Sequence, residues 1–176
     1  MKLNFKKRIA TYNLIAIATI MAFAFFFFYC GVYYTSYKHL DDDISTEKTE
    51  VFSNLDWDDD AIIMNKMPEW EEEEHKQVEV NPTFIQIVDL KGKTVFKSAN
   101  LQENHFLFNP KNKKTVFYNA TINNKKIRQG QFPVINDKNK IIGQLTIGVS
   151  QQESYNVLHN LLIVLVATYI FIISIL

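Results

Sequence analysis

Two long apolar segments dominate the hydrophobic pattern of the sequence. The first runs from 9 to 37 and the second from 157 to 176, and neither contains Asp, Glu, Lys or Arg. Crossing the hydrocarbon core of a bilayer takes about 20 apolar helical residues, so each segment is long enough. The second segment is also apolar on all sides, which a surface helix of a small soluble domain cannot be. The pattern therefore predicts two transmembrane helices.

Basic residues indicate how these helices are oriented. Four of them precede the first segment, namely Lys2, Lys6, Lys7 and Arg8. Only Lys38 closely follows it. The positive-inside rule then places 1–8 in the cytoplasm, 38–156 outside, and residue 176 at the cytoplasmic face. A cleaved signal peptide is the alternative, because Ala22-Phe23-Ala24 fits a cleavage site. The apolar segment is too long for a signal peptide, so we expect an uncleaved anchor.

The polar middle of the chain predicts one α+β domain. Leu40, Ile44, Val51 and Leu55 recur at helical spacing, which predicts that a helix continues from the first apolar segment. From Asp56 to Glu79, carboxylates and a proline predict a loop or short helices. Alternating β-branched and aromatic residues then predict five antiparallel strands, at 83–88, 94–98, 115–122, 127–135 and 141–149. A last helix starts at Gln151 and enters the second apolar segment.

Composition and charge narrow the function. The formal net charge is zero, which argues against a nucleic-acid binder. The charge is nevertheless divided: 41–79 holds 15 acidic and 3 basic residues, whereas 80–153 holds 4 acidic and 11 basic ones. We expect ion pairing between the acidic part (38–79) and the strand-rich part (80–150). Because Cys30 is the only cysteine, an intrachain disulfide and a multi-cysteine metal site are excluded.

One stretch resembles a known family. Residues 85–101 read IQIVDLKGKTVFKSANL, an aliphatic strand that ends in Asp-x-x-Gly and leads to Ser-x-x-Leu. Together with Ile127-Arg128, the strand 143–150 and a helix entering the second apolar segment, this is similar to the N-terminal sensor region of bacterial two-component sensor histidine kinases. The resemblance covers essentially the whole chain, and it implies a PAS-like extracytoplasmic (periplasmic) domain between two helices of the bacterial inner membrane.

The same resemblance implies a setting for signal transduction. The family's sensors work as homodimers in lipid and reach a response regulator through a HAMP linker and a kinase domain that uses ATP and Mg²⁺. None of the motifs of those domains occurs in this sequence, so we expect an input module truncated before them, without catalytic residues or a cofactor. The alternatives are the input module of a chemoreceptor or cyclase, and a stand-alone accessory or structural membrane protein.

The acidic residues are the candidate site for cation or ligand sensing. Carboxylates are the ligands that Ca²⁺ and Mg²⁺ prefer, and the alternative is a solvated face neutralised by the basic part. The candidates are Asp41, Asp42, Asp43, Asp56, Asp58, Asp59, Asp60, Glu71, Glu72, Glu73 and Glu74. A softer metal at His39, His75 and His105 with Met64 and Met67 lacks the spacing of a paired site. His159 is either a pH sensor or an interfacial structural residue.

Overall fold

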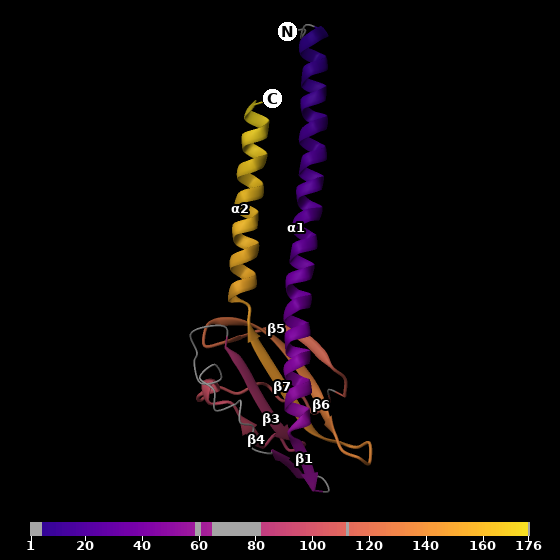
Figure 1. Ribbon diagram of the computed structural model, residues 1–176, viewed down its shortest axis with the longest axis vertical. Helices are drawn as coiled ribbons and strands as arrows, with labels where there is room; N and C mark the ends of the chain where they lie inside the picture. Colours follow the sequence, from indigo (N-terminus) through magenta and orange to yellow (C-terminus); the bar gives the residue numbers. More distant parts are fainter. Residues whose placement is uncertain (1–4, 59–60, 65–81, 112, 176) are drawn as a thin grey trace. The chain divides into compact units, whose positions relative to one another are not determined.

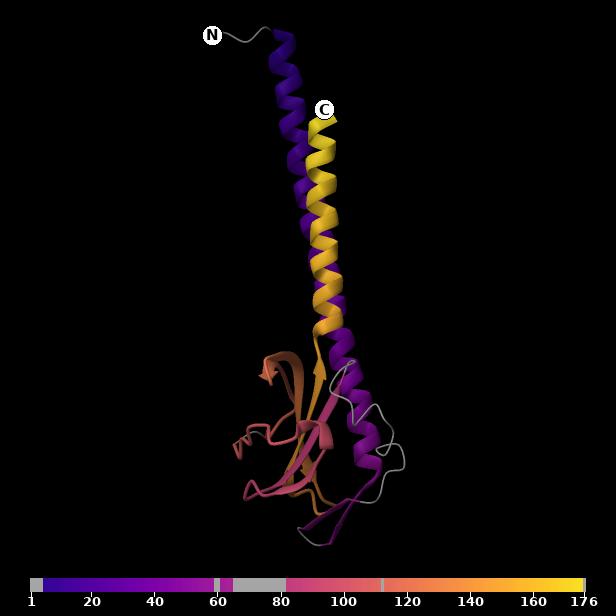
Figure 2. The same ribbon diagram turned by 90° about the vertical axis from the view of Figure 1, so that its left-hand side faces the viewer.

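The protein consists of two compact units. The computed structural model describes residues 5–58, 61–64, 82–111 and 113–175 (Figures 1 and 2). The first unit comprises Met1–Tyr37 and Ser154–Leu176, and the second is Lys38–Glu153. The first unit is helical, whereas the second combines a helical segment with antiparallel sheet. The predicted mixture of helices and antiparallel strands, with a long apolar helix on each side of the sheet in the sequence, is confirmed.

The first unit is built from two apolar helices. They are the N-terminal part of α1 (Phe5–Ser53) and most of α2 (Gln152–Ile175). Both are long and apolar enough to cross a membrane by length and composition, and their most apolar windows are only 0% and 6% buried. The helices run side by side in Figure 1, and α2 overlaps α1 in Figure 2. The Tyr169 ring meets that of Phe25 edge-on at 6.5 Å, and the Tyr169 hydroxyl donates a hydrogen bond to the Ala18 carbonyl at 3.4 Å.

A five-stranded antiparallel sheet forms the centre of the second unit. Its order is β4-β3-β7-β6-β5, so the last strand lies in the middle. The strands are β3 (Thr83–Asp89), β4 (Thr94–Lys97), β5 (Val116–Ile122), β6 (Lys125–Ile135) and β7 (Ile141–Ser150). All five predicted strands are confirmed, with bounds shifted by two residues at most.

Local turn chemistry explains why these strands were visible in the sequence. Asn123 and Asn124, between β5 and β6, have φ angles of 48° and 61°. Two successive residues with positive φ make the type I′ turn that matches strand twist, and asparagine tolerates that conformation. Gly92 has a φ of 77° in the β3–β4 turn, where the Asp89 carboxylate accepts hydrogen bonds from the amides of Lys91 and Lys93 at 2.8 and 2.9 Å.

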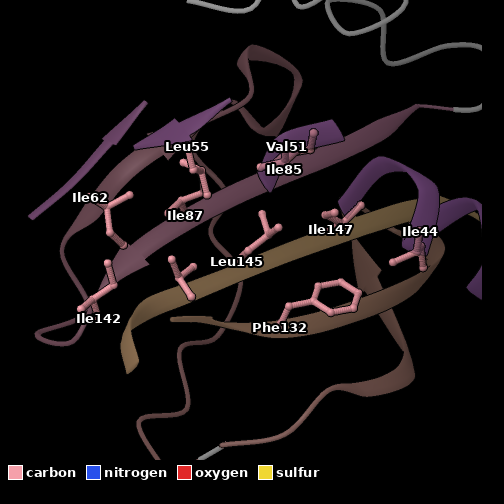
Figure 3. Close-up of a cluster of buried hydrophobic side chains, with 11 residues drawn as sticks. Ile44, Val51, Leu55, Ile62, Ile85, Ile87, Phe132, Ile142, Leu145 and Ile147 are labelled. Atoms are coloured by element: carbon pink, nitrogen blue, oxygen red, sulfur yellow. The ribbon is translucent and has the colours of Figure 1, made fainter. Parts of the chain in front are cut away.

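The C-terminal part of α1, from Lys38 to Ser53, covers one face of the sheet. Figure 3 shows Ile44 and Val51 of this helix packed against side chains of β3, β7 and β6, such as Ile85, Leu145 and Phe132. The helix comes unusually close at β6. A Cβ on Gly130 would lie 2.6 Å from Cγ2 of Ile44, so only glycine leaves room for that side chain.

The other face is covered by a short segment of the chain. It comprises the 3₁₀ helix η3 (Ala99–Leu101) and the residues that follow it. Leu101 and Phe106 of this segment pack on Phe84, Ile122 and Ile127 of the sheet. Gly148 lies beneath it, because a Cβ there would be 2.9 Å from Cζ of Phe106. We call residues 98–109 the covering segment.

One predicted region has a different structure. Residues from Asp56 onward were expected to form a loop or short helices, but β1 (Leu55–Asp58) and β2 (Ala61–Met64) form a two-stranded antiparallel hairpin. The prediction also placed Leu55 on the helical face, and this was wrong. The helix α1 ends at Ser53, and Leu55 is the first residue of β1. The carboxylates alternate with apolar residues in β1, so Leu55 is buried while Asp56 and Asp58 are exposed.

Candidate functional site: an ion pair and a groove between α1 and β6

The predicted acidic site is dispersed over several elements. Asp41, Asp42 and Asp43 lie on α1, and Asp56 and Asp58 lie on β1. The remaining candidates, Asp59, Asp60 and Glu71 to Glu74, lie outside the described residues. Within the described part of the chain, no group of three or more His, Cys, Asp or Glu side chains could hold a metal ion. Cation sensing by the acidic segment therefore stays a prediction.

The histidine and methionine candidates are also separated. His39 pairs with Asp43 one turn along α1, at 3.3 Å between Nδ1 and Oδ1, and both side chains are exposed. Met64 ends β2, and His105 lies in the covering segment. His75 and Met67 lie outside the described residues. The placed members of this set thus belong to three different elements.

Asp41 instead forms a bidentate ion pair with Arg128. Nε of Arg128 donates to Oδ1 at 2.6 Å and Nη2 donates to Oδ2 at 2.9 Å. The side chains are only 17% and 27% exposed for Arg128 and Asp41. Paired geometry and partial burial make this contact stronger than an ordinary surface ion pair. It joins the acidic part to the strand-rich part, which is an example of the pairing expected from the charge distribution.

Two amide side chains extend the ion pair across the sheet. Nη1 of Arg128 donates to Oδ1 of Asn119 on β5 at 3.1 Å, and Nε2 of Gln151 donates to the same oxygen at 2.7 Å. Gln151 also bonds the Ile127 carbonyl through its side chain at 2.9 Å and the Lys126 carbonyl through its amide at 3.0 Å. We call the four side chains of Asp41, Asn119, Arg128 and Gln151 the clamp.

The clamp joins the two ends of the second unit. Asp41 lies on α1 within one turn of Lys38, where this unit begins, and Gln151 directly precedes α2. Between them stand Asn119 and Arg128, which are cross-strand partners on β5 and β6. The network therefore connects the helix that enters the unit with the residue that directly precedes α2.

A groove lies further along the same helix and the same strand. Its volume is about 420 Å³, and its walls come from both elements and from the residue that precedes β5: Lys48, Thr49, Phe52, Thr115, Phe132, Pro133 and Ile135. Nζ of Lys48 stands 5.4 Å from the ring centroid of Phe52 and 5.3 Å from that of Phe132. A third ring, that of Phe117, packs edge-on against Phe132, with 5.8 Å between the ring centroids. The groove thus has aromatic walls and one cation.

On the opposite face, buried amides fasten the covering segment to the sheet. Gln86 exchanges two hydrogen bonds with the Phe106 main chain, at 2.7 and 3.3 Å, and Gln131 donates to the Leu107 carbonyl at 3.0 Å. Thr146 lies between these two glutamines in the strand register. These directional bonds to the backbone add to the apolar contacts of Leu101 and Phe106, so the row helps to hold the covering segment in place.

Two further polar groups belong to this row. Gln129 donates to the Tyr118 hydroxyl at 2.6 Å, and burial raises the pKa of that hydroxyl. Gln144 donates to the Thr146 hydroxyl at 3.0 Å, while its own side-chain oxygen is buried without a hydrogen-bond partner among the described residues. The row therefore consists of neutral groups, and it lacks the charge found on the α1 side.

Sequence reasoning named Asp41 but missed the rest of the clamp and the groove. Lys48 was counted only as a charge, and Arg128 and Gln151 were noted only for the resemblance and as a helix start. The one available signal was the charge division, which predicts pairing without saying which residues pair. Comparison with known proteins adds nothing to these residues, since no family model, curated protein or solved structure matches the chain.

Proposed function

We propose that this chain is the sensor part of a membrane receptor, of the kind that controls a histidine kinase in two-component signalling. In this proposal the second unit is a PAS-like extracytoplasmic domain, and α1 and α2 span the membrane. The observation that carries it is the clamp, because one hydrogen-bonded network includes α1 and the residue that precedes α2. A receptor needs such a connection between its sensing domain and both of its membrane helices.

The surface of the helical unit supports a membrane setting. The apolar windows of α1 and α2 are almost entirely exposed, and water would oppose that exposure. Lys6, Lys7 and Arg8 lie at one end of α1, which favours a cytoplasmic position for that end.

Membrane topology is the first test. In a Cys30→Ser background, single cysteines at positions 6 and 113 would be treated in intact cells with a membrane-impermeant maleimide. We expect labelling at position 113, in the second unit, and protection at position 6. Labelling at both positions or at neither would contradict the proposed topology.

The signalling role is tested with a fusion. The chain would be joined through Leu176 to the HAMP and kinase domains of a well-characterised sensor kinase, and output would be read from its reporter gene. We expect Arg128→Asp to change the basal output about fivefold or more, because like charges would then face each other at the clamp. The exchanged pair Asp41→Arg with Arg128→Asp should return the output toward that of the unmodified fusion.

The matched control is Lys113→Asp, the same charge reversal at an exposed lysine. It should leave the output unchanged. If the clamp variants reach the membrane in normal amounts and also leave the output unchanged, the clamp does not couple the domain to the helices.

A further inference from the structure

The groove between α1 and β6 combines polar groups with apolar walls. Lys48 supplies an ammonium group, and Thr115 supplies a hydroxyl that has no partner among the described residues. The apolar walls include Phe52, Phe132 and Pro133. A concave surface of this kind, mostly apolar with few polar groups, is the usual form of a small-molecule site. Its volume of about 420 Å³ lies at the small end of such sites.

The positive charge of Lys48 favours a negatively charged ligand. Its ammonium is half-buried and held between two aromatic rings, and the described residues provide no carboxylate within ion-pair distance. An ammonium has three donors, which contacts with the ring faces leave available for hydrogen bonds. Because its surroundings are partly apolar, an anion placed there interacts more strongly than it would in water.

The lining of the groove favours a ligand with one negative charge. Lys48 carries the only formal charge among the described residues that line it. A single carboxylate can pair with this ammonium, but a second would have to lie against the apolar walls. The apolar body of the ligand would then occupy the space beside Phe52, Phe132 and Pro133.

We propose that this groove binds a small amphipathic monocarboxylate, a molecule with one carboxylate and a compact aromatic or aliphatic body. The inference rests on the proposed function, since it names the class of ligand that the sensor would detect. Lys48 lies two helical turns after Asp41 on α1, and Phe132 lies four residues after Arg128 on β6. A ligand in the groove therefore contacts both of the elements that the clamp joins.

The test measures binding by the full chain in nanodiscs of neutral phosphatidylcholine. Calorimetric titrations would use phenylacetate and hexanoate, with phenylacetamide as the uncharged counterpart of the first and empty nanodiscs as the blank. We expect at least one carboxylate to bind, and phenylacetamide to bind about tenfold or more weakly than phenylacetate. Failure of both carboxylates to bind at about 10 mM would overturn the proposal.

Two variants locate the binding. Lys48→Met keeps the length of the side chain and removes its charge, and it should weaken binding about tenfold or more. Thr49→Trp keeps Lys48 and fills the groove from an exposed position of α1, so it should also abolish binding. Lys113→Met is the control and should bind as the unmodified chain does. Unchanged binding by both groove variants, with folding verified by circular dichroism, would place the ligand elsewhere and overturn the proposal.

Failure here is distinguishable from failure of the proposed function. The clamp experiment needs no ligand, so clamp variants that shift kinase output while no carboxylate binds would refute the ligand class alone. Binding that depends on Lys48, without any response to the clamp variants, would refute the signalling role and leave the site intact.

Discussion

The two faces of the central sheet are covered in different ways. Beneath α1 the contact is mainly apolar, and charged side chains occur in the clamp and in the groove. Beneath the covering segment, buried glutamines form directional hydrogen bonds with the backbone. Apolar packing tolerates small sliding of one element over another, whereas a hydrogen bond is lost within a fraction of an ångström. The α1 face is therefore suited to movement and the other face to rigidity.

The largest expected effect comes from removing apolar contact on the α1 face. Leu145 is fully buried in the centre of the sheet, in the cluster shared with Ile44 and Val51. Leu145→Ala should lower the unfolding free energy of the second unit by about 3–5 kcal/mol, because it removes buried surface and leaves a cavity. Denaturant unfolding in nanodiscs measures this change. Leu90→Ala in the β3–β4 turn, where the side chain is 46% exposed, is the control and should change stability little.

Hydrogen exchange sharpens the same comparison. In the Leu145→Ala variant, we expect faster exchange of the α1 amides around Ile44, with exchange in the covering segment less affected. Equal acceleration on both faces would show that they do not behave as separate layers.

A smaller effect is expected on the second face. Gln86→Leu keeps the shape of the side chain but leaves the amide and carbonyl of Phe106 buried without their partner. The expected loss is about 2–3 kcal/mol, with faster hydrogen exchange confined to residues 98–109. Thr121→Leu, another polar-to-apolar change at an exposed position of β5, is the control. Faster exchange of α1 in Gln86→Leu would contradict the independence of the two faces.

The smallest effect concerns pH. Burial raises the pKa of the Tyr118 hydroxyl above its ordinary value of 10.0. The folded state then holds this proton more tightly than the unfolded state does, so its contribution to stability is complete below pH 10 and is lost as the pH rises through the folded-state pKa. We expect the unfolding free energy to fall above pH 10 less steeply in Tyr118→Phe than in the unmodified protein.

The comparison uses the slope of the unfolding free energy against pH and not its absolute value, because Tyr118→Phe also removes the hydrogen bond from Gln129. Equal slopes for Tyr118→Phe and the unmodified protein would show that this hydroxyl does not contribute.

The sequence predicted the features that have local signals and missed those that depend on contacts between distant residues. Strands and turns were predictable because their signals are local, such as the Asn123-Asn124 turn or the alternation of Leu145 and Ile147. The hairpin of β1 and β2 was missed because charge was given more weight than the alternation around Leu55. The position of β7 in the sheet, the glutamine row and the partner of Asp41 depend on contacts between residues far apart in sequence, which no local pattern specifies.

The close contact between Ile44 and Gly130 lies between the clamp and the groove on both α1 and β6. Ile44 lies between Asp41 and Lys48 on the helix, and Gly130 lies between Arg128 and Phe132 on the strand. At about 1.5 Å per residue, the helix extends roughly 5 Å from Ile44 toward the clamp and 6 Å toward the groove. Because Ile44 fits against a strand with no Cβ, the helix cannot approach the strand further at this point. We expect an outward push at the groove to turn the helix about this contact, with arms of nearly equal length on either side.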